Sequence, residues 1–187
     1  MPITKTICIF CGAKKGRNDR IIELATIVGK IIARKNINLV CGGGNTGLMS
    51  IVTAAAVSEG GFVTGILSDG LKSEVPNTNS TKLIKTPCLQ TRKKVMIEIA
   101  DAFLILPGGY GTLDEFFEIM VLYRIAMIKK PIVLFNYLGF WDDIIKQMDR
   151  IQQEGFLSQH DSKAPIIVNN IEEFQNWLSI FDCIREK

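Results

Sequence analysis

The stretch Leu106-Pro107-Gly108-Gly109-Tyr110-Gly111-Thr112-Leu113-Asp114-Glu115 decides the fold of this chain. It follows an apolar run at 102–106 that predicts a buried strand, and it leads into an apolar run at 116–128 that predicts a helix. Because glycine has no Cβ, its backbone N–H can approach a ligand directly, and a helix start adds unpaired N–H groups that suit phosphate. The stretch therefore predicts a phosphate-binding turn between a strand and a helix.

A structural interpretation of the same stretch competes with this one. Thr112 and Glu115 have the spacing of a capping box, in which each side chain satisfies a backbone donor of the other residue. Asp114 and Glu115 in a first helical turn are also ordinary partners of the helix dipole. The stretch alone leaves both interpretations open.

Strands and helices alternate along the whole chain. Apolar runs predict strands at 6–11, 37–41, 62–67, 82–85, 102–106, 132–135 and 165–168, and helices at 21–33, 48–58, 91–100, 116–128, 141–153 and 171–183. Nearly all-apolar strands in such an alternation indicate a parallel sheet with helices on both faces. The sequence therefore predicts a three-layer α/β fold in a single domain that spans residues 1–187.

Three glycine-bearing segments follow strands of this predicted sheet, at 11–16, 42–47 and 108–111. Ligands of open parallel sheets bind beyond the carboxyl ends of the strands, near the point where the strand order reverses. The convergence of three such segments at one edge is stronger evidence for a ligand site than any one of them.

The second segment also matches a dinucleotide-binding pattern. Gly42, Gly44 and Gly47 satisfy G-x-G-x-x-G, and Asp69 lies roughly twenty residues further on, as the pattern requires. The pattern normally follows the first strand, whereas here it follows the second. We interpret the segment as a phosphate or nucleotide cradle, with NAD binding as the alternative function and close helix–strand packing as the structural explanation.

Several charged side chains near this edge are candidates for the site. Arg92 precedes Lys93 and Lys94 at a predicted helix start, and its planar guanidinium suits a phosphate or carboxylate. We interpret Lys94 as a solvated surface charge. Glu74 lies in the irregular segment after the third strand, where a solvated carboxylate and a functional one both remain open. His160, the one histidine, lies in a polar segment, so we expect no catalytic or metal-binding role for it.

Composition excludes several functional classes. Apolar residues make up 47% of the chain and charged residues 22%, as is usual for a soluble globular protein. The net charge of +3 is too small to indicate nucleic acid as a partner, but it is compatible with a small anionic ligand. No apolar run reaches membrane-spanning length and no signal peptide is evident, so we expect a cytoplasmic protein with no membrane partner.

Cysteine usage supports the same compartment. Because the number of cysteines is odd and most lie in apolar surroundings, we expect reduced thiols at Cys8, Cys11, Cys41, Cys88 and Cys183. The C-x-x-C formed by Cys8 and Cys11 has no second pair, which makes zinc or redox chemistry a minor alternative. No His, Cys and Asp cluster has metal-ligand spacing, so we expect no metal and no cofactor.

The predicted helix at 116–128 is apolar nearly all round. Such a helix must be buried on more than one side. It is either a central core helix or part of an interface between two copies of the chain.

Three motifs resemble those of one known family. The chain carries P-G-G-x-G-T-x-x-E at Pro107–Glu115, G-G-G-x-x-G-L-M at Gly42–Met49 and R-K-x-x-M at Arg92–Met96. In this combination the chain resembles the LOG family of cytokinin riboside 5′-monophosphate phosphoribohydrolases, often labelled lysine decarboxylases. The resemblance implies a Rossmann-like fold, a homodimer and cleavage of the N-glycosidic bond of a nucleoside monophosphate to a free base and ribose 5-phosphate.

The resemblance also implies roles for individual residues. Arg92 and Glu115 match the catalytic pair. Together with the predicted glycine cradle, the expected substrate-binding residues are Gly43, Gly44, Thr46, Gly47, Glu74, Lys93, Gly108, Gly109, Tyr110, Gly111, Thr112 and Asp114.

The chain departs from the family pattern at positions that contact the ligand. Gln90 stands where the family commonly has His, and Val121-Leu122 replaces a Thr-Trp pair. The departures leave the choice between AMP and N6-substituted AMP open. They also motivate an alternative in which the protein is a non-catalytic nucleotide sensor or carrier.

Overall fold

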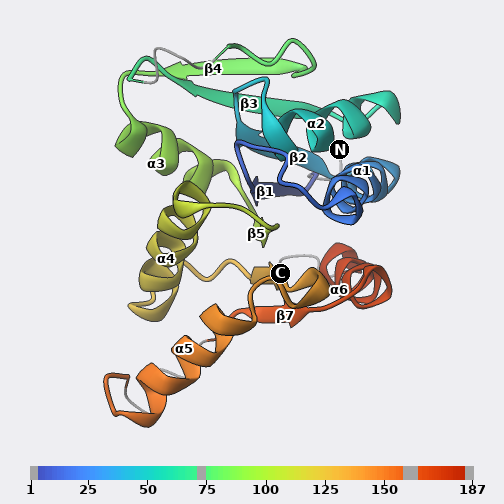
Figure 1. Ribbon diagram of the computed structural model, residues 1–187. Helices are drawn as coiled ribbons and strands as arrows, with labels where there is room; N and C mark the ends of the chain where they lie inside the picture. The colour runs from blue at the N-terminus through green and yellow to red at the C-terminus, as the bar shows by residue number, and fades with distance from the viewer. Residues whose placement is uncertain (1–3, 71–74, 158–163, 184–187) are drawn as a thin grey trace.

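The predicted alternation of strands and helices is confirmed. The computed structural model describes residues 4–70, 75–157 and 164–183 (Figure 1). Its strands are β1 (Thr6–Phe10), β2 (Asn38–Gly42), β3 (Val63–Ser68), β4 (Lys82–Thr86), β5 (Ala102–Ile105), β6 (Ile132–Phe135) and β7 (Ile166–Val168). Its helices are α1 (Asp19–Arg34), α2 (Gly47–Ser58), α3 (Leu89–Ile99), α4 (Tyr110–Arg124), the short 3-10 helix η1 (Tyr137–Gly139), α5 (Asp142–Gln153) and α6 (Ile171–Cys183).

The strands of the described residues form one parallel sheet in the order β4-β3-β2-β1-β5-β6-β7. The chain builds outward from β1 to β4 and then returns to place β5 on the other side of β1 (Figure 1). The strand order therefore reverses between β1 and β5, and the crevice beyond their carboxyl ends is the expected place for a ligand.

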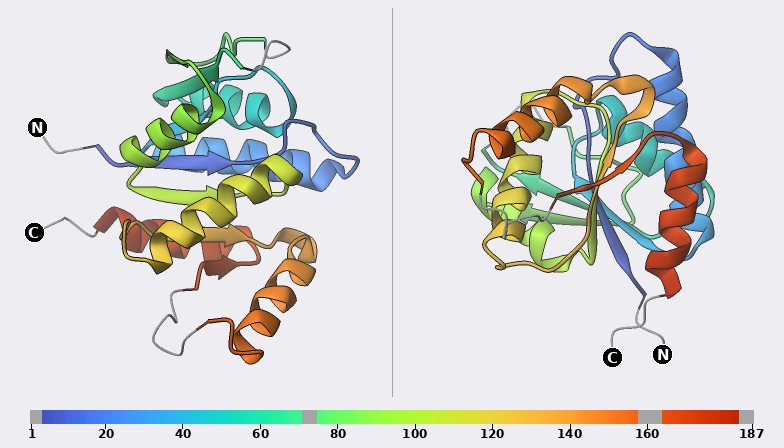
Figure 2. Two further views of the ribbon diagram at one scale, coloured as in Figure 1. Left: turned by 90° about the vertical axis from the view of Figure 1, so that its left-hand side faces the viewer. Right: turned by 90° about the horizontal axis from the view of Figure 1, so that it is seen from below.

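Helices cover both faces of the sheet, which confirms the three-layer α/β fold (Figure 2). On β1, Ile7 and Ile9 face the core made with α1, α2 and α6, whereas Cys8 and Phe10 face the core made with α3, α4 and α5. This alternation follows from the two-residue period of a strand. Because both faces of β1 are buried from Ile7 onward, its side chains from Ile7 to Phe10 are all apolar, as predicted from the sequence.

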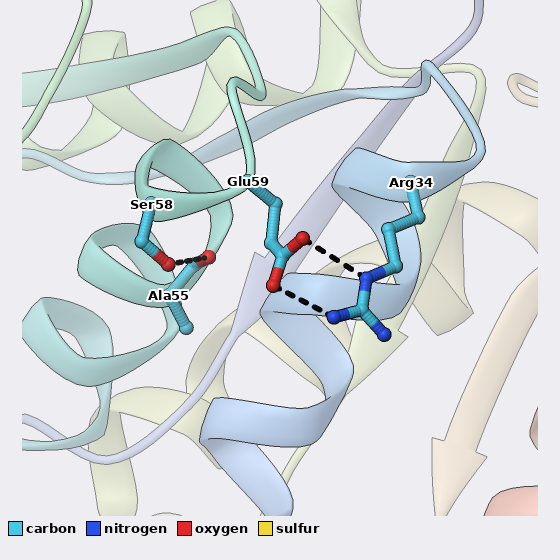
Figure 3. Close-up of polar contacts among 4 residues, drawn as sticks. All are labelled: Arg34, Ala55, Ser58 and Glu59. Carbon is cyan, nitrogen blue, oxygen red and sulfur yellow. Dashed lines mark hydrogen bonds and ion pairs between the residues drawn. The ribbon is translucent and has the colours of Figure 1, made fainter.

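Helices α1 and α2 approach each other closely. A Cβ on Gly29 of α1 would lie 2.3 Å from the carbonyl oxygen of Val52, so only glycine fits at this crossing. At the far ends of the two helices, the Arg34 guanidinium donates two hydrogen bonds to the Glu59 carboxylate, with Nε–Oε2 and Nη2–Oε1 distances of 3.0 and 2.8 Å (Figure 3). Both helices end at the amino edge of the sheet, so this ion pair lies opposite the crevice.

Candidate active site

The three glycine-bearing segments meet at the carboxyl edge of the sheet, as predicted. The Gly12 N–H donates to the Pro107 carbonyl at 3.1 Å, and the Gly12 carbonyl accepts from the Leu48 N–H at 2.9 Å. A Cβ on Gly47 would lie 2.3 Å from the carbonyl carbon of Ala13. The first segment is therefore held between the other two.

A crevice of about 730 Å³ opens beside these segments. This volume is in the range of pockets that hold nucleotide-sized ligands. Its lining comes from the first loop, the starts of α2, α3 and α4, and the segment after β6: Cys11, Gly12, Ala13, Lys14, Lys15, Gly16, Ile21, Leu48, Met49, Leu89, Gln90, Arg92, Lys93, Pro107, Gly108, Gly109, Tyr110, Gly111, Thr112, Asp114, Glu115 and Phe140.

The start of α4 presents open backbone to this crevice. Nothing lies within 4 Å of the position that a Cβ would take on Gly109 or Gly111. Neither residue has a left-handed φ, so the fold does not require glycine at either position. The first N–H groups of α4 have no partner within the helix, and they lie at the positive end of its dipole. This combination suits an anion.

The capping-box interpretation of Thr112 and Glu115 is wrong. Helix α4 begins at Tyr110, earlier than predicted, with Gly109 as its N-cap and no side-chain capping bond. Thr112 therefore lies inside the helix, where its buried side chain packs against Gly108 at a distance that leaves no room for a Cβ there. Glu115 lies one turn beyond the positions that a capping box would need.

Arg92 and Glu115 lie on facing helices of the crevice wall. Arg92 is only 6% exposed, and a Cβ on Gly42 would lie 2.0 Å from its Nη2 atom, so the guanidinium packs directly on the backbone of β2. Burial raises the pKa of Glu115 to about 7, although the charge of Arg92 opposes that rise. A carboxyl group with this pKa exchanges protons readily at neutral pH, which is the property of a general acid or base.

Lys93 joins α3 to α4 beside this pair. Its Nζ lies 2.9 Å from Oδ2 of Asp114 and 2.5 Å from Oε2 of Glu118. Burial lowers the pKa of Lys93, but the hydrogen bonds to Glu118 and Asp114 outweigh burial and raise it. Lys93 therefore stays charged and fixes the start of α4 against α3.

Among the described residues that line the crevice, none of the glycines of the 42–47 segment is found. Gly43 packs on Leu67, since a Cβ on Gly43 would lie only 2.6 Å from Cγ of Leu67, while Gly44 forms an isolated bridge with Pro76. Thr46 and Gly47 begin α2 without a side-chain capping bond. The substrate-binding role of Gly43, Gly44, Thr46 and Gly47 stays a prediction, and Glu74 and His160 lie outside the described residues.

The crevice contains residues that the sequence did not single out as site residues. Lys14 and Lys15 lie in the loop that follows β1. Two adjacent lysines in a glycine-bearing loop could have been recognised from the sequence as a candidate anion site. Phe140 reaches the crevice from the segment after β6, where no motif marks it. Leu48, Met49 and Leu89 supply an apolar wall. The sequence prediction placed Leu48 and Met49 only at a helix start and left Leu89 outside any element.

The described part of the crevice holds one cysteine and no cluster of metal-ligand side chains. Cys11 lines the crevice, but burial raises its pKa well above the usual value and keeps the thiol protonated. Among residues 4–70, 75–157 and 164–183, no group of three His, Cys, Asp or Glu side chains could hold a metal ion. Within the same ranges, no helix combines the length and apolarity that a membrane span requires.

Comparison with known proteins assigns the chain to a family. Residues 49–178 match the family model described as "Possible lysine decarboxylase". The cytokinin riboside 5′-monophosphate phosphoribohydrolase of Rhodococcoides fascians is 34% identical over 173 residues, which cover 91% of this chain and 87% of that protein. The corresponding enzyme LOG of Oryza sativa subsp. japonica is 36% identical over 164 residues, covering 87% and 67%.

Solved structures confirm the fold independently of sequence. The molybdenum cofactor binding protein of the phototrophic bacterium Rippkaea orientalis superimposes with a TM-score of 0.72 over 97% of this chain and 99% of that chain, at 20% identity. At 20% identity, this structural similarity shows only a shared fold. The sequence matches, at 34% and 36% identity, show which family the chain belongs to. The chain belongs to the LOG family of cytokinin riboside 5′-monophosphate phosphoribohydrolases.

Proposed function

We propose that the protein cleaves the N-glycosidic bond of AMP or of an N6-substituted, cytokinin-type nucleoside 5′-monophosphate. The products are the free base and ribose 5-phosphate. The observation that carries this proposal is the Arg92–Glu115 pair beside the open backbone at the start of α4. The activity named for the relatives supports it.

The phosphate end of the substrate binds at the start of α4. Gly109 and Gly111 leave room there, and the unpaired N–H groups of the first turn donate to phosphate oxygens. Binding energy gained at the phosphate positions the sugar for reaction at its other end. Asp114, held by Lys93, stays at the crevice rim without competing for the phosphate-binding donors.

Glu115 acts on the sugar. Cleavage of a glycosidic bond passes through an oxocarbenium-like state, whose positive charge an ionised carboxylate stabilises while it also activates water. Arg92 lowers the pKa of Glu115 from the value that burial alone would give, so a useful fraction of the carboxylate is ionised at neutral pH. Arg92 thus keeps the carboxylate active and orients it.

The base lies against the apolar wall formed by Leu48, Met49, Leu89 and Phe140. Gln90, on the same wall, offers an amide that can both donate to and accept from a purine edge. AMP and its N6-substituted forms both remain candidate substrates, because this wall is apolar enough for an added alkyl group.

The test is product formation by the wild-type protein. AMP and N6-isopentenyl-AMP are incubated separately with the protein, and free base and ribose 5-phosphate are separated by chromatography. We expect the two products in equal amounts from at least one substrate. Absence of free base from both, at high protein concentration, would refute the proposal.

A nucleotide sensor or carrier that uses the same crevice is the second candidate. Gln90 and the Val121-Leu122 pair, which replace polar residues of the family pattern, favour it. Calorimetry that finds tight AMP binding without release of adenine would support it. NAD binding stays the least supported alternative, since neither Gly42–Gly47 nor Asp69 is among the described residues that line the crevice. It fails if NAD does not raise the melting temperature while AMP or ribose 5-phosphate does.

We also propose that α4 forms the two-fold interface of a homodimer. Phe117, Val121 and Ile125 lie on one side of α4 and its C-cap and are 41%, 56% and 59% exposed. An exposed apolar stripe of this kind marks a protein contact. Light scattering at micromolar concentration should give twice the chain mass, and Val121→Lys should give the monomer mass. A wild-type monomer would refute this proposal.

A further inference from the structure

The loop between β1 and α1 brings two lysines to a fixed place in the crevice. The Gly12 N–H donates a hydrogen bond to the Pro107 carbonyl, and the Gly12 carbonyl accepts one from the Leu48 N–H. The backbone nitrogen of Lys14 lies only 2.5 Å from the position that a Cβ on Gly47 would occupy. The backbone from which the Lys14 and Lys15 side chains start is thus held against both neighbouring glycine segments.

This loop lies directly beside the start of α4. A Cβ on Gly12 would be 3.4 Å from Cα of Gly108, and Lys14 and Lys15 line the same crevice as Gly108–Thr112. Both lysines are exposed at the crevice mouth, so their flexible side chains can reach an anion seated on the first turn of α4.

The charges of the crevice leave these two lysines unmatched. Lys93 is paired with Asp114, and Arg92 faces Glu115. Within the described part of the chain, Lys14 and Lys15 make no ion pair. A phosphate monoester carries about −1.5 to −2 charges at pH 7, which complements two lysines.

We propose that Lys14 and Lys15 are specificity-determining residues that bind the 5′-phosphate together with the neighbouring α4 N–H groups, and so select phosphorylated nucleosides over unphosphorylated ones. The identity of the substrate as a nucleoside 5′-phosphate rests on the proposed function. The binding of a phosphate group by the two lysines does not. The backbone at α4 supplies directional hydrogen bonds, whereas the lysines supply charge. Because the lysines are exposed, their contribution depends on ionic strength.

The test is the binding of ribose 5-phosphate to the Lys14→Gln/Lys15→Gln double variant, measured by calorimetry at low and high salt. We expect the affinity at low salt to fall roughly tenfold, the scale of two exposed ion pairs, and its salt dependence to flatten. The KM for AMP should rise with little change in kcat, while the kinetics with adenosine should stay unchanged. Lys14→Arg/Lys15→Arg should restore binding.

Arg17→Gln is the matched control, because Arg17 is an exposed cation of the same loop outside the crevice lining. It should bind ribose 5-phosphate as the wild type does. Wild-type affinity in the double variant, or an equal loss in Arg17→Gln, would overturn the inference. Lysine-dependent binding by a wild type that releases no base would support the phosphate site and refute the hydrolase instead.

Discussion

The two glycine-rich loops of this protein look alike in sequence and differ in structure. In Gly42–Gly47, the space beside Gly42, Gly43 and Gly47 is filled by Arg92, Leu67 and the backbone of Ala13. In the loop that opens α4, the space beside Gly109 and Gly111 is empty. The Gly42–Gly47 loop holds the crevice wall together, and the loop that opens α4 leaves room for a ligand.

The charged residues beside the two loops, Arg92 and Glu115, also differ in how well their surroundings suit their charge. Arg92, supported by Gly42, is buried in a close-fitting place, whereas Glu115 one turn into α4 has a pKa that burial raises to about 7. A carboxyl group in such a place costs stability whenever it is ionised. Proteins keep such locally unfavourable arrangements mainly at functional sites, which is consistent with a functional role for Glu115.

The largest expected effect is on folding stability, at Gly47 of the Gly42–Gly47 loop. Gly47 has a φ of +61°, and a Cβ there would lie 2.3 Å from the backbone of Ala13. In Gly47→Ala, alanine would have to adopt a left-handed φ, and its Cβ would clash with the Ala13 backbone, which cannot move aside as a flexible side chain could. The substitution should therefore lower the free energy of unfolding by about 4 kcal/mol. Urea denaturation measures this, and an unchanged midpoint would show that the loop is not a packing device.

The next effect concerns Glu115 and stability. Because its pKa is raised from near 4.5 to about 7 on folding, the stability that Glu115 contributes is present at pH 4 and is lost as the pH rises through 7. Glu115→Gln has no such loss and should be more stable than the wild type by about 3 kcal/mol at pH 8, with no difference at pH 4. Equal pH dependence in the two proteins would contradict this account of the site.

Activity should have the opposite pH dependence. If ionised Glu115 stabilises the sugar cation, kcat/KM for AMP falls about tenfold for each pH unit below the pKa of about 7. The residual activity of Glu115→Gln should lack this slope. A rate that falls above pH 7 instead would assign Glu115 as the acid that protonates the leaving base.

The smallest expected effect distinguishes glycines that leave room for a ligand, Gly109 and Gly111, from Gly108, which packs against Thr112. Gly109→Ala and Gly111→Ala should not lower the unfolding midpoint but should weaken ribose 5-phosphate binding roughly tenfold, about 1.4 kcal/mol, because each methyl group occupies open crevice. Gly108→Ala is the control, since its Cβ would lie 2.1 Å from Oγ1 of Thr112 and should destabilise the fold. Unaltered binding in both Gly109 and Gly111 variants would move the phosphate elsewhere.

Strand and helix periodicity sufficed to predict the parallel sheet, the edge at which the crevice lies and the meeting of three glycine segments there. Pattern alone failed at the start of α4. Thr112 and Glu115 have capping-box spacing, but the turn formed by Pro107–Gly109 lets the helix begin earlier, which places Thr112 inside it. Helix boundaries depend on such local geometry, which spacing does not encode.

The glycine pattern at 42–47 could not reveal which groups of the fold these glycines pack against. A glycine next to a ligand and a glycine next to Leu67 or Ala13 are identical in sequence, and only tertiary contacts distinguish them. Phe140 was equally hidden, because it enters the crevice through the fold rather than through a motif. The charge of Lys14 and Lys15 was visible, but its proximity to Gly108 was not.

The most direct test of the proposed mechanism is the release of adenine from AMP by Glu115→Gln, compared with the wild type at the same pH and with Asp114→Asn as the neighbouring control. Gln keeps the size of the side chain and removes its charge. We expect a loss of at least about 10²-fold in kcat for Glu115→Gln and a smaller loss for Asp114→Asn, with ribose 5-phosphate binding retained in Glu115→Gln. Release of adenine by Glu115→Gln at a near-wild-type rate would contradict the mechanism.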